Sequence, residues 1–237
     1  MKIEVHPDDI VIARKAAAII ADAARAAISS RGRFVMAVSG GHTPWLMLRA
    51  FADERLSWEG VHVVQVDERV APPGDPERNL AHLRESLLDH APLPSEQIHA
   101  MPVDAPDLNG AAQQYAAQLR EVAGSPPVLD LVHLGLGADG HTASLVPEDP
   151  VLDVTDADVA VTNPYQGRRR MTLTFPIINR SRRVLWLVTG REKAEALVRL
   201  NAGDPSIPAS GVRRDRALVL ADRAAAAALN TPEKWER

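Results

Sequence analysis

The sequence predicts a doubly wound α/β fold, Rossmann-like, in which helices cover both faces of a mainly parallel sheet. Short apolar runs alternate with amphipathic segments along the chain, which is the pattern of parallel strands joined by helical crossovers. The apolar runs lack polar alternation, as expected for strands that are buried on both faces. The chain has 237 residues, 46% of them hydrophobic, and can therefore fill a sizeable core. We expect residues 1–237 to form a single domain.

The first predicted elements are a long helix and a short strand. Asp8 or Asp9 can cap a helix in which Ala and Ile recur at helical spacing as far as about Ser30. The apolar run Phe34–Val38 is the first strand, and a second helix begins near Pro44. The other elements predicted in this half are strands at 61–66 and 129–134 and helices at 79–88 and 108–122.

The second half continues the alternation. Strands are predicted at 159–162, 171–174, 184–188 and 217–220, with a helix at 192–200 and an Ala-rich helix after Asp222. The Pro-rich stretches 71–76 and 124–127 are short enough to be loops, so neither marks a domain boundary. Ligands of doubly wound sheets bind beyond the carboxyl ends of the strands. The residues that follow each apolar run are therefore the candidates for a functional site.

Charge and composition exclude several classes of protein. The formal net charge is -4 and the isoelectric point is near 6.1, so no general basic field attracts nucleic acid or an anionic membrane. The absence of cysteine excludes a disulfide framework, a thiolate nucleophile and a cysteine metal site. Charged residues and Pro7 occupy the segment where a signal peptide needs apolar residues. We expect a cytoplasmic protein that binds neither nucleic acid nor membrane.

The first candidate site is the loop Ser39-Gly40-Gly41-His42-Thr43-Pro44, which joins the strand 34–38 to the next helix. Glycines let backbone N–H groups approach an anion, and a helix N-terminus adds partial positive charge. The loop therefore indicates a phosphate cradle. A tight turn with Thr43 as the helix cap explains the same residues equally well. The spacing of a P-loop is missing, so a nucleoside triphosphate is not indicated.

Two charged segments are further candidates. Asp67-Glu68-Arg69 follows the strand 61–66, and three charges at the end of a buried strand need solvent, a ligand or one another. A structural ion pair is the plainer interpretation of this segment, and contact with a ligand is the alternative. Near other strand and helix ends lie the cations Arg168, Arg169, Arg170 and Lys193. Basic clusters are usually solvated, so each of these cations is a candidate only.

The most informative loop runs from Gly135 to Leu145 and reads Gly-Leu-Gly-Ala-Asp-Gly-His-Thr-Ala-Ser-Leu. It contains Gly-x-Gly-x-x-Gly after a strand, but the next strand lacks the terminal acidic residue of a dinucleotide site. Asp139 and His141 are expected at a helix N-terminus beside one cavity, where an imidazole can take a proton from water near neutral pH. The alternative is that Asp139 caps the helix and His141 is a surface residue.

Motifs of other hydrolytic mechanisms are missing from the sequence. The sequence has no Gly-x-Ser-x-Gly elbow, and it has no His-Glu-x-x-His or other dense spacing of metal ligands. A hydrolase with this sequence would have to activate water directly.

Five motifs follow one another along the chain. They are Ser39-Gly40-Gly41-x-Thr43-Pro44, Asp67-Glu68-Arg69-Val70 with Asn79, Gly135-Leu136-Gly137-x-Asp139-Gly140-His141-Thr142-Ala143-Ser144-Leu145-x-Pro147, Arg170-Met171-Thr172-Leu173-Thr174 and Gly190-x-x-Lys193-Ala194. In this order they resemble the motifs of the 6-phosphogluconolactonase family. The resemblance implies a fold shared with glucosamine-6-phosphate deaminase and, more distantly, ribose-5-phosphate isomerase. It also implies hydrolysis of 6-phosphoglucono-1,5-lactone to 6-phosphogluconate without metal or cofactor.

The resemblance further implies roles for the candidate residues. His141 would be the general base that draws a proton from the attacking water, and Asp139 would orient it or assist proton transfer. The residues expected to bind phosphate and sugar oxygens or the developing oxyanion are Ser39, Gly40, Gly41, Thr43, Asp67, Arg69, Arg170 and Lys193. The expected partner is a small sugar-phosphate lactone, and the expected assembly is a monomer or a homodimer.

Two other functions stay open. Glucosamine-6-phosphate deaminase shares several of these motifs, but it carries a carboxylate where this chain has Val146 and a tyrosine where this chain has Arg69. Glu148 is two residues farther on, which changes the direction and reach of its side chain. A non-catalytic sugar-phosphate sensor is the third class, although the sequence shows no DNA-binding segment. The chain departs from the lactonase pattern at His42, where Ser is common, and at residues 208–212, which lack the expected histidine of the C-terminal pocket wall.

Overall fold

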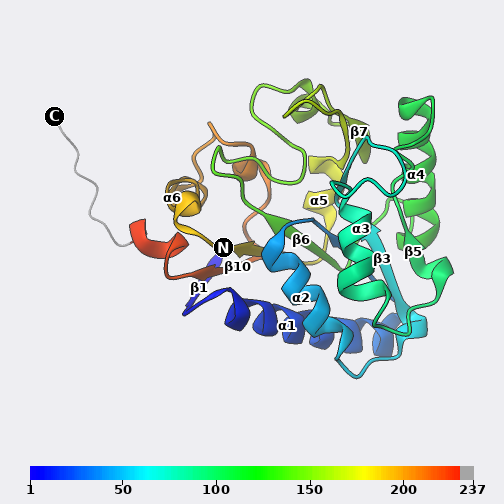
Figure 1. The fold of residues 1–237 in the computed structure, drawn as a ribbon, viewed down its shortest axis with the longest axis horizontal. Helices are drawn as coiled ribbons and strands as arrows, with labels where there is room; N and C mark the ends of the chain where they lie inside the picture. The colour runs from blue at the N-terminus through cyan, green and yellow to red at the C-terminus, as the bar shows by residue number, and fades with distance from the viewer. Residues whose placement is uncertain (230–237) are drawn as a thin grey trace.

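A seven-stranded parallel sheet forms the centre of the computed structural model, which describes residues 1–229 (Figure 1). Its strand order is β1-β10-β9-β6-β2-β3-β5, and every neighbouring pair is parallel. The strands are β1 (Lys2–His6), β2 (Phe34–Val38), β3 (Val61–Gln65), β5 (Ile98–His99), β6 (Leu131–Gly135), β9 (Val184–Val188) and β10 (Ala217–Asp222). The predicted mainly parallel α/β sheet is confirmed.

The strand order reverses next to β2. From β2 the chain adds β3 and β5 on one side, and it then returns to place β6, β9 and β10 on the other side. The loops that leave β2 and β6 therefore run in opposite directions, which opens a crevice at the carboxyl edge of the sheet. The candidate loops 39–44 and 136–145 both begin at this crevice.

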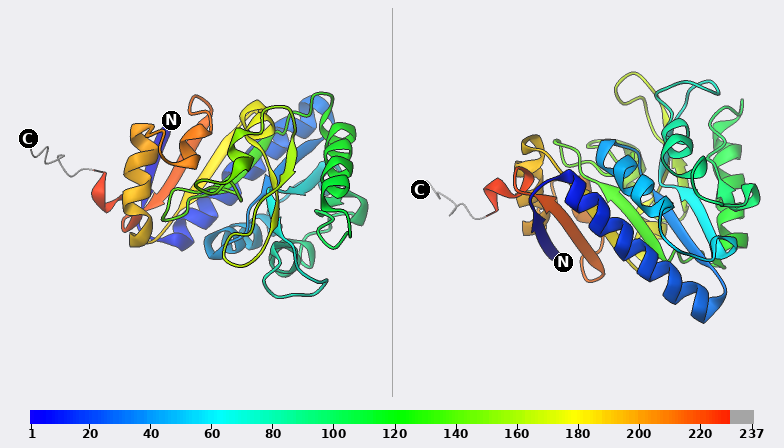
Figure 2. Two further views of the ribbon diagram at one scale, coloured as in Figure 1. Left: turned by 90° about the horizontal axis from the view of Figure 1, so that it is seen from above. Right: turned by 60° about the horizontal axis from the view of Figure 1, so that its bottom comes forward.

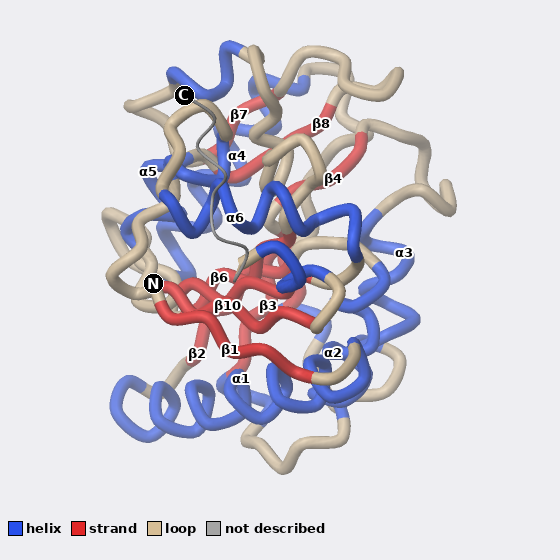
Figure 3. Tube along the Cα trace, turned by 90° about the vertical axis from the view of Figure 1, so that its left-hand side faces the viewer, coloured by secondary structure: helices blue, strands red, loops and turns tan. Residues whose placement is uncertain are grey.

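A small antiparallel sheet lies beyond the main sheet (Figure 3). It contains β4 (Asp67–Arg69), β8 (Arg170–Leu173) and β7 (Val159–Val161), in the order β4-β8-β7. Only Val66 separates β3 from β4, so the chain passes directly from one sheet to the other. The register pairs Arg69 with Arg170, which places two candidate cations on neighbouring strands.

Helices cover both faces of the main sheet. One layer holds α1 (Asp9–Arg31), which runs along the sheet in Figure 2, with α2 (His42–Ala52) and α3 (Asn79–Leu83). The other layer holds α4 (Leu108–Ala123), α5 (Phe175–Arg180) and α6 (Ala194–Ala202). Successive side chains of a strand point to opposite faces, so Phe34, Met36 and Val38 of β2 join the first layer and Val35 and Ala37 join the second.

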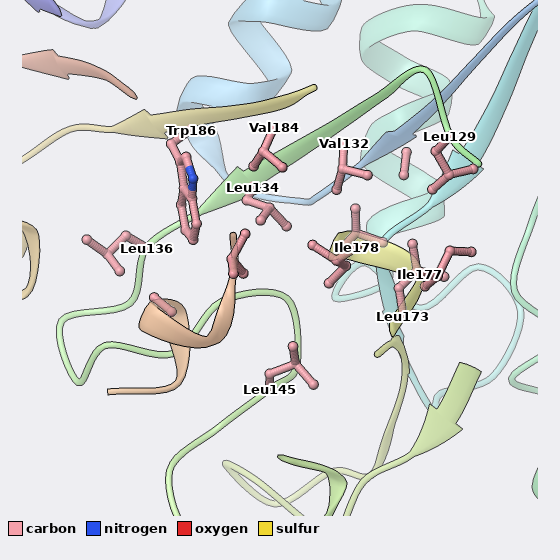
Figure 4. Packing of buried hydrophobic residues seen from close by; sticks show 14 of the residues in the cluster. Leu129, Val132, Leu134, Leu136, Leu145, Leu173, Ile177, Ile178, Val184 and Trp186 are labelled. Carbon is pink, nitrogen blue, oxygen red and sulfur yellow. The ribbon is translucent and has the colours of Figure 1, made fainter. Parts of the chain in front are cut away.

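The core on the α5 side anchors the loop that follows β6. Leu134, Trp186, Ile178 and Leu145 belong to one buried cluster, which Figure 4 shows from close by. Leu145 is fully buried, and burial of a side chain of this size contributes about 1.5–3 kcal/mol. The core therefore fixes one end of the loop that carries Asp139 and His141.

Several element predictions are confirmed. Asp8 caps α1 by accepting the backbone N–H of Val11, and Gly32 ends the helix with a φ of 75°. The strands 34–38 and 184–188 have the predicted bounds. The strand predicted at 217–220 extends to 222, and the helix predicted at 108–122 ends one residue later.

One element prediction is wrong, and two predicted helices differ from the structure in helix type or in their ends. No helix begins in the loop after β6: residues 136–149 are irregular, with a bridge between Thr142 and Leu145, so Asp139 is not a helix cap. The predicted helix 79–88 changes after Leu83 into the π-helical turn η2 (Arg84–Leu88). The predicted helix 192–200 starts as a 3-10 turn, η5 (Arg191–Lys193).

The predicted Ala-rich helix after Asp222 is only a 3-10 turn, η7 (Ala225–Ala228), in the described part of the chain, and residues 230–237 lie outside it. The other short turns are η1 (Trp58–Gly60), η3 (Ser95–Gln97), η4 (Pro150–Asp153) and η6 (Pro208–Gly211). Within residues 1–229, no helix combines the length and the apolar character needed to cross a bilayer.

Candidate active site

A cavity of about 760 Å³ lies at the carboxyl edge of the sheet, where the strand order reverses. The predicted residues that line it are Ser39, Gly40, Gly41, Thr43, Asp67, Arg69, His141, Arg170 and Lys193. Asp139 is absent from the wall and contacts His141 from behind. The fold thus brings the predicted residues together from segments that are far apart in the sequence.

His141 and Asp139 form a close pair at this wall. The Nδ1 atom of His141 lies 2.6 Å from Oδ1 of Asp139, and the backbone N–H of His141 donates to the same oxygen at 3.2 Å. Partial burial opposes ionisation of Asp139, but its hydrogen bonds outweigh burial and lower its pKa. An ionised carboxylate only accepts hydrogen bonds, so Nδ1 of His141 carries the proton. Nε2 is then the nitrogen that can accept a proton from water.

A tight glycine turn makes this pairing possible. The backbone N–H of Gly140, which has a φ of 84°, donates to the carbonyl of Gly137 at 3.0 Å. A Cβ atom at Gly137 would lie 2.1 Å from Nδ1 of His141 and 2.5 Å from Oδ1 of Asp139. The first of these distances leaves no room for a side chain. Gly137 therefore makes space for the His–Asp pair.

The segment 207–212 supports this turn from behind. The backbone N–H of Ala209 donates to the carbonyl of Gly140 at 3.0 Å, and a Cβ atom at Gly140 would lie 2.5 Å from Cβ of Ile207. None of the residues 208–212 lines the cavity. At these residues, where the chain departs from the lactonase pattern, the segment instead supports the turn that carries His141.

The loop after β2 presents a helix N-terminus to the cavity. Gly41 precedes the first residue of α2 and no side chain caps the helix, so Thr43 is not its cap. The hydroxyl of Thr43 instead lies 2.7 Å from that of Thr189, which joins this loop to the loop after β9. The Ser39 hydroxyl donates to the carbonyl of His133 at 3.1 Å. The first N–H groups of a helix have no partner within it and can bind an anion.

The charges that follow β3 divide into structural and cavity-lining groups. Glu68 is fully buried and accepts the backbone N–H groups of Asn79 and Leu80, both at 2.8 Å. It therefore holds the start of α3, and its Oε2 atom also lies 3.7 Å from Nε of Arg78, which is the structural ion pair that the plainer interpretation expected. Asp67 lines the cavity and accepts the hydroxyl of Ser144 at 2.6 Å, and burial raises the pKa of Asp67.

The cations of the cavity differ in their partners. Arg168 forms ion pairs with Asp75 at 3.2 Å and with Glu77 at 2.8 Å. Among the described residues, neither Arg170 nor Lys193 has a carboxylate oxygen within 4.0 Å. Arg170 is buried, burial lowers its pKa, and its Nε atom has no hydrogen-bond partner in residues 1–229. A buried cation without a counter-ion favours an anionic ligand.

Sequence reasoning missed several side chains of the site, among them Tyr165, Trp45 and Thr189. The hydroxyl of Tyr165 donates to Oδ2 of Asp139 at 3.0 Å, and the ring of Trp45 stacks on His82 at the cavity wall, with ring centroids 3.9 Å apart. Thr189 lines the cavity and directly follows β9, so the rule that sites lie after strands could have found it. Tyr165 and Trp45 carry no local pattern of that kind.

Among residues 1–229, no three side chains of His, Cys, Asp or Glu are grouped so that they could hold a metal ion. The cavity beside the His–Asp pair is lined by four cations, Arg69, Arg168, Arg170 and Lys193, and by three carboxylates, Asp67, Glu77 and Glu192. Fold and site together define a class: doubly wound α/β proteins with a cationic cavity for a small anionic ligand at the point where the strand order reverses.

Comparison with known proteins identifies the family within this class. The chain belongs to the family Glucosamine-6-phosphate isomerases/6-phosphogluconolactonase, whose family model matches residues 7–220. It is similar to the 6-phosphogluconolactonase of Mycobacterium tuberculosis, with 40% identity over 241 residues, which cover 96% of this chain and 98% of that protein.

Solved structures agree with this assignment. The 6-phosphogluconolactonase of Thermotoga maritima is 27% identical, with a TM-score of 0.83 and coverage of 93% of this chain and 98% of that one. A monomeric glucosamine-6-phosphate deaminase also has a TM-score of 0.83, at 23% identity, and covers 96% of this chain and 100% of its own. The predicted sharing of a fold with the deaminase is confirmed.

Proposed function

We propose that this chain is a carboxylic ester hydrolase that converts 6-phospho-D-glucono-1,5-lactone to 6-phospho-D-gluconate in the oxidative pentose phosphate pathway. The relative from Mycobacterium tuberculosis, which it matches over nearly its full length, is a 6-phosphogluconolactonase. The observation that carries the proposal is the 2.6 Å contact of His141 with Asp139 on the wall of a cationic cavity. This arrangement offers a base for water and an anion site in the same space.

In the proposed reaction, His141 is the general base. Its Nε2 atom takes a proton from water while the water oxygen bonds to the carbonyl carbon of the lactone. Ionised Asp139 keeps the proton on Nδ1 and stabilises the imidazolium that forms. General-base catalysis of this kind supplies a factor of about 10²–10⁴ in rate.

The cavity cations serve the negative charges of the substrate and the intermediate. Attack of water places a negative charge on the carbonyl oxygen, and preorganised cations stabilise such a charge most in a site shielded from water. When the intermediate collapses, the bond from the carbonyl carbon to the ring oxygen breaks and the imidazolium protonates that oxygen. The new carboxylic acid then loses its proton to solvent. The loop 39–43, Arg69, Arg170 and Lys193 together bind the phosphate and the oxyanion in this proposal. Asp67 binds the sugar hydroxyls.

Deaminase activity is less well supported by the site. Val146 is buried, and Glu148 is not among the residues that line the cavity. Neither position therefore offers the carboxylate that ring opening of an amino sugar phosphate needs.

The test is the decay of freshly generated 6-phosphogluconolactone, measured against its spontaneous hydrolysis. Acceleration by the protein is the expected result. Ammonia release from glucosamine 6-phosphate without acceleration of lactone decay would instead establish the deaminase. Tight binding of sugar phosphates without turnover would indicate a sensor.

The proposal extends to the whole chain. We propose that residues 1–237 form one 6-phosphogluconolactonase-like domain, because a single family model matches residues 7–220. We further propose that it works in the cytoplasm as a monomer or a homodimer, without metal, cofactor, nucleic acid or membrane as a partner. Its net charge of -4 supports the part of this proposal that concerns nucleic acid and anionic membranes.

A further inference from the structure

Tyr165 lies next to the His–Asp pair on the loop between β7 and β8. Its backbone N–H donates to the carbonyl of Arg168 at 2.9 Å, which closes a tight turn. Within this turn Gln166 has a φ of 52° and Gly167 a φ of 80°. A non-glycine residue in the left-handed region is uncommon and is kept only where its surroundings hold it. The turn therefore gives the Tyr165 side chain a defined direction.

The Tyr165 side chain contacts three groups of the site. Its hydroxyl donates to Oδ2 of Asp139 at 3.0 Å. Its ring meets the His141 ring edge to face, with centroids 5.6 Å apart and an interplanar angle of 63°. The guanidinium carbon of Arg170 lies 5.1 Å from the centre of the same ring, within the range of a cation–π contact.

In these contacts the two carboxylate oxygens of Asp139 have different partners. Oδ1 faces the backbone N–H and Nδ1 of His141, and Oδ2 faces the Tyr165 hydroxyl. The carboxylate therefore cannot rotate without losing a hydrogen bond on one side. Burial and the neighbouring Asp139 carboxylate raise the pKa of Tyr165, so the phenol keeps its proton and remains a donor at neutral pH.

We propose that Tyr165 is a positioning residue, which acts on His141 through Asp139. This inference rests on the proposed lactonase function. The tyrosine hydroxyl holds the carboxylate so that Oδ1 stays on Nδ1 of His141, and it draws negative charge toward Oδ2. Both effects set the orientation and the basicity of the imidazole that takes a proton from water.

The direction in which the protonation of His141 shifts follows from the charge on Asp139. Without the hydroxyl, Asp139 concentrates its charge on the oxygen that faces His141 and stabilises the protonated imidazole more strongly. The pH at which His141 becomes protonated should then rise in Tyr165→Phe. The other charged groups that share the cavity with His141 are Asp67, Arg69, Glu77, Arg168, Arg170, Glu192 and Lys193, and none of them changes in this variant.

Tyr165→Phe is the direct test, because it removes only the hydroxyl and keeps the ring against His141 and Arg170. We expect kcat for lactone hydrolysis to fall about tenfold with less than a twofold change in KM, since a hydrogen bond to a charged group is lost. We also expect the acid limb of the kcat profile to move to higher pH. His42 and His82 line the same cavity, so NMR titration of the His141 ring must accompany the kinetics.

The His141 resonance can be assigned among the eight histidines by its loss in His141→Gln. Tyr115→Phe is the matched control, because that hydroxyl contacts Gln65 and His99 in the core rather than the His–Asp pair. The control should lower the denaturation midpoint and leave the His141 titration unchanged.

A midpoint of the His141 titration that moves up in Tyr165→Phe and stays fixed in Tyr115→Phe supports the inference. A midpoint that is unchanged or lower in Tyr165→Phe overturns it, whatever the rate. The His141 titration can be measured without turnover. It therefore tests the role of Tyr165 separately from the proposed lactonase function. Failure of the wild type to accelerate lactone decay rejects the proposed function, and the titration still decides the role of Tyr165.

Discussion

Arg170 and Arg168 are two arginines of the same cavity with different surroundings. Arg168 is neutralised by Asp75 and Glu77, whereas Arg170 is buried and has no ion-pair partner within residues 1–229. Loss of a charge-assisted hydrogen bond to an anion costs about 1.5–3 kcal/mol. We therefore predict that Arg170→Gln lowers kcat/KM for the lactone about 10- to 100-fold.

Arg168→Gln is the matched control for this prediction. Steady-state kinetics of the two variants should show less than a threefold loss for Arg168→Gln, because its charge is already paired. Equal losses in the two variants would contradict the proposed role of Arg170 as a ligand of the substrate.

Individual residues differed in how far the sequence could predict them. His141 and Asp139 were found because two titratable residues flank a glycine directly after a buried strand. Tyr165 was missed because it reaches Asp139 from a position 26 residues farther along the chain, which no local pattern records. For Glu68, the charge pattern was visible but the choice between ligand and structural partner depended on the burial that the fold imposes.

The turn 137–141 is the element on which the His–Asp pair depends. A methyl group at Gly137 would fall 2.1 Å from Nδ1 of His141, so the pair must separate or the turn must open. We predict that Gly137→Ala lowers kcat for the lactone at least about tenfold, because general-base catalysis supplies about 10²–10⁴ and misplacement removes part of it.

The control for Gly137→Ala is its denaturation curve. Gly137 is buried and an added methyl group meets the His–Asp pair, so the free energy of unfolding should fall by about 1–3 kcal/mol, as for overpacking elsewhere, and the variant should still unfold in one cooperative transition. Unimpaired kcat in a folded variant would show that the close approach of Gly137 to the pair has no catalytic importance.

The pattern of apolar and charged side chains decided whether an element could be predicted from the sequence. The strand 34–38 was predicted because both of its faces are apolar and buried. β1 was missed because Lys2 and Glu4 interrupt its apolar pattern, as befits a strand at the edge of the sheet. The loop 136–149 was mistaken for a helix start because its Asp and Gly residues also suit a helix cap, whereas Gly140 adopts a φ of 84° and turns the chain back.

The stability of the whole molecule should depend on two buried histidines. Burial lowers the pKa of His133 to about 3 and that of His99 to about 4. In the unfolded chain a histidine titrates near pH 6.5. Below that pH the two histidines are protonated in the unfolded state but stay neutral in the folded state. The free energy of unfolding therefore has its full value above about pH 6.5 and decreases as the pH falls toward about 4.

Denaturant unfolding at several pH values measures this dependence. His133→Asn is the informative variant, since an amide oxygen can still accept the Ser39 N–H that now approaches Nδ1 of His133 at 3.3 Å. We predict that the variant loses less stability between about pH 6.5 and 4.5, with a slope smaller by up to about 1.4 kcal/mol per pH unit. Parallel curves for variant and wild type would contradict a neutral, buried His133.

At the scale of the whole molecule, the alternation of strands and helices predicted the fold class, but not the position of each strand. The placement of β6 beside β2 depends on contacts between segments far apart in the sequence. Strands were predicted at the positions of β7 and β8, but their separate antiparallel sheet was not, because β4 has only three residues and pairs with a strand far along the chain.

The measurement that tests the central claim most directly is the decay of freshly generated 6-phosphogluconolactone with wild type and His141→Ala. We predict that wild type accelerates decay above the spontaneous rate and that His141→Ala, with an unchanged denaturation curve, loses at least about a hundredfold in rate. A His141→Ala variant that hydrolyses the lactone as fast as wild type would contradict the account, because the base would then have to lie elsewhere in the cavity.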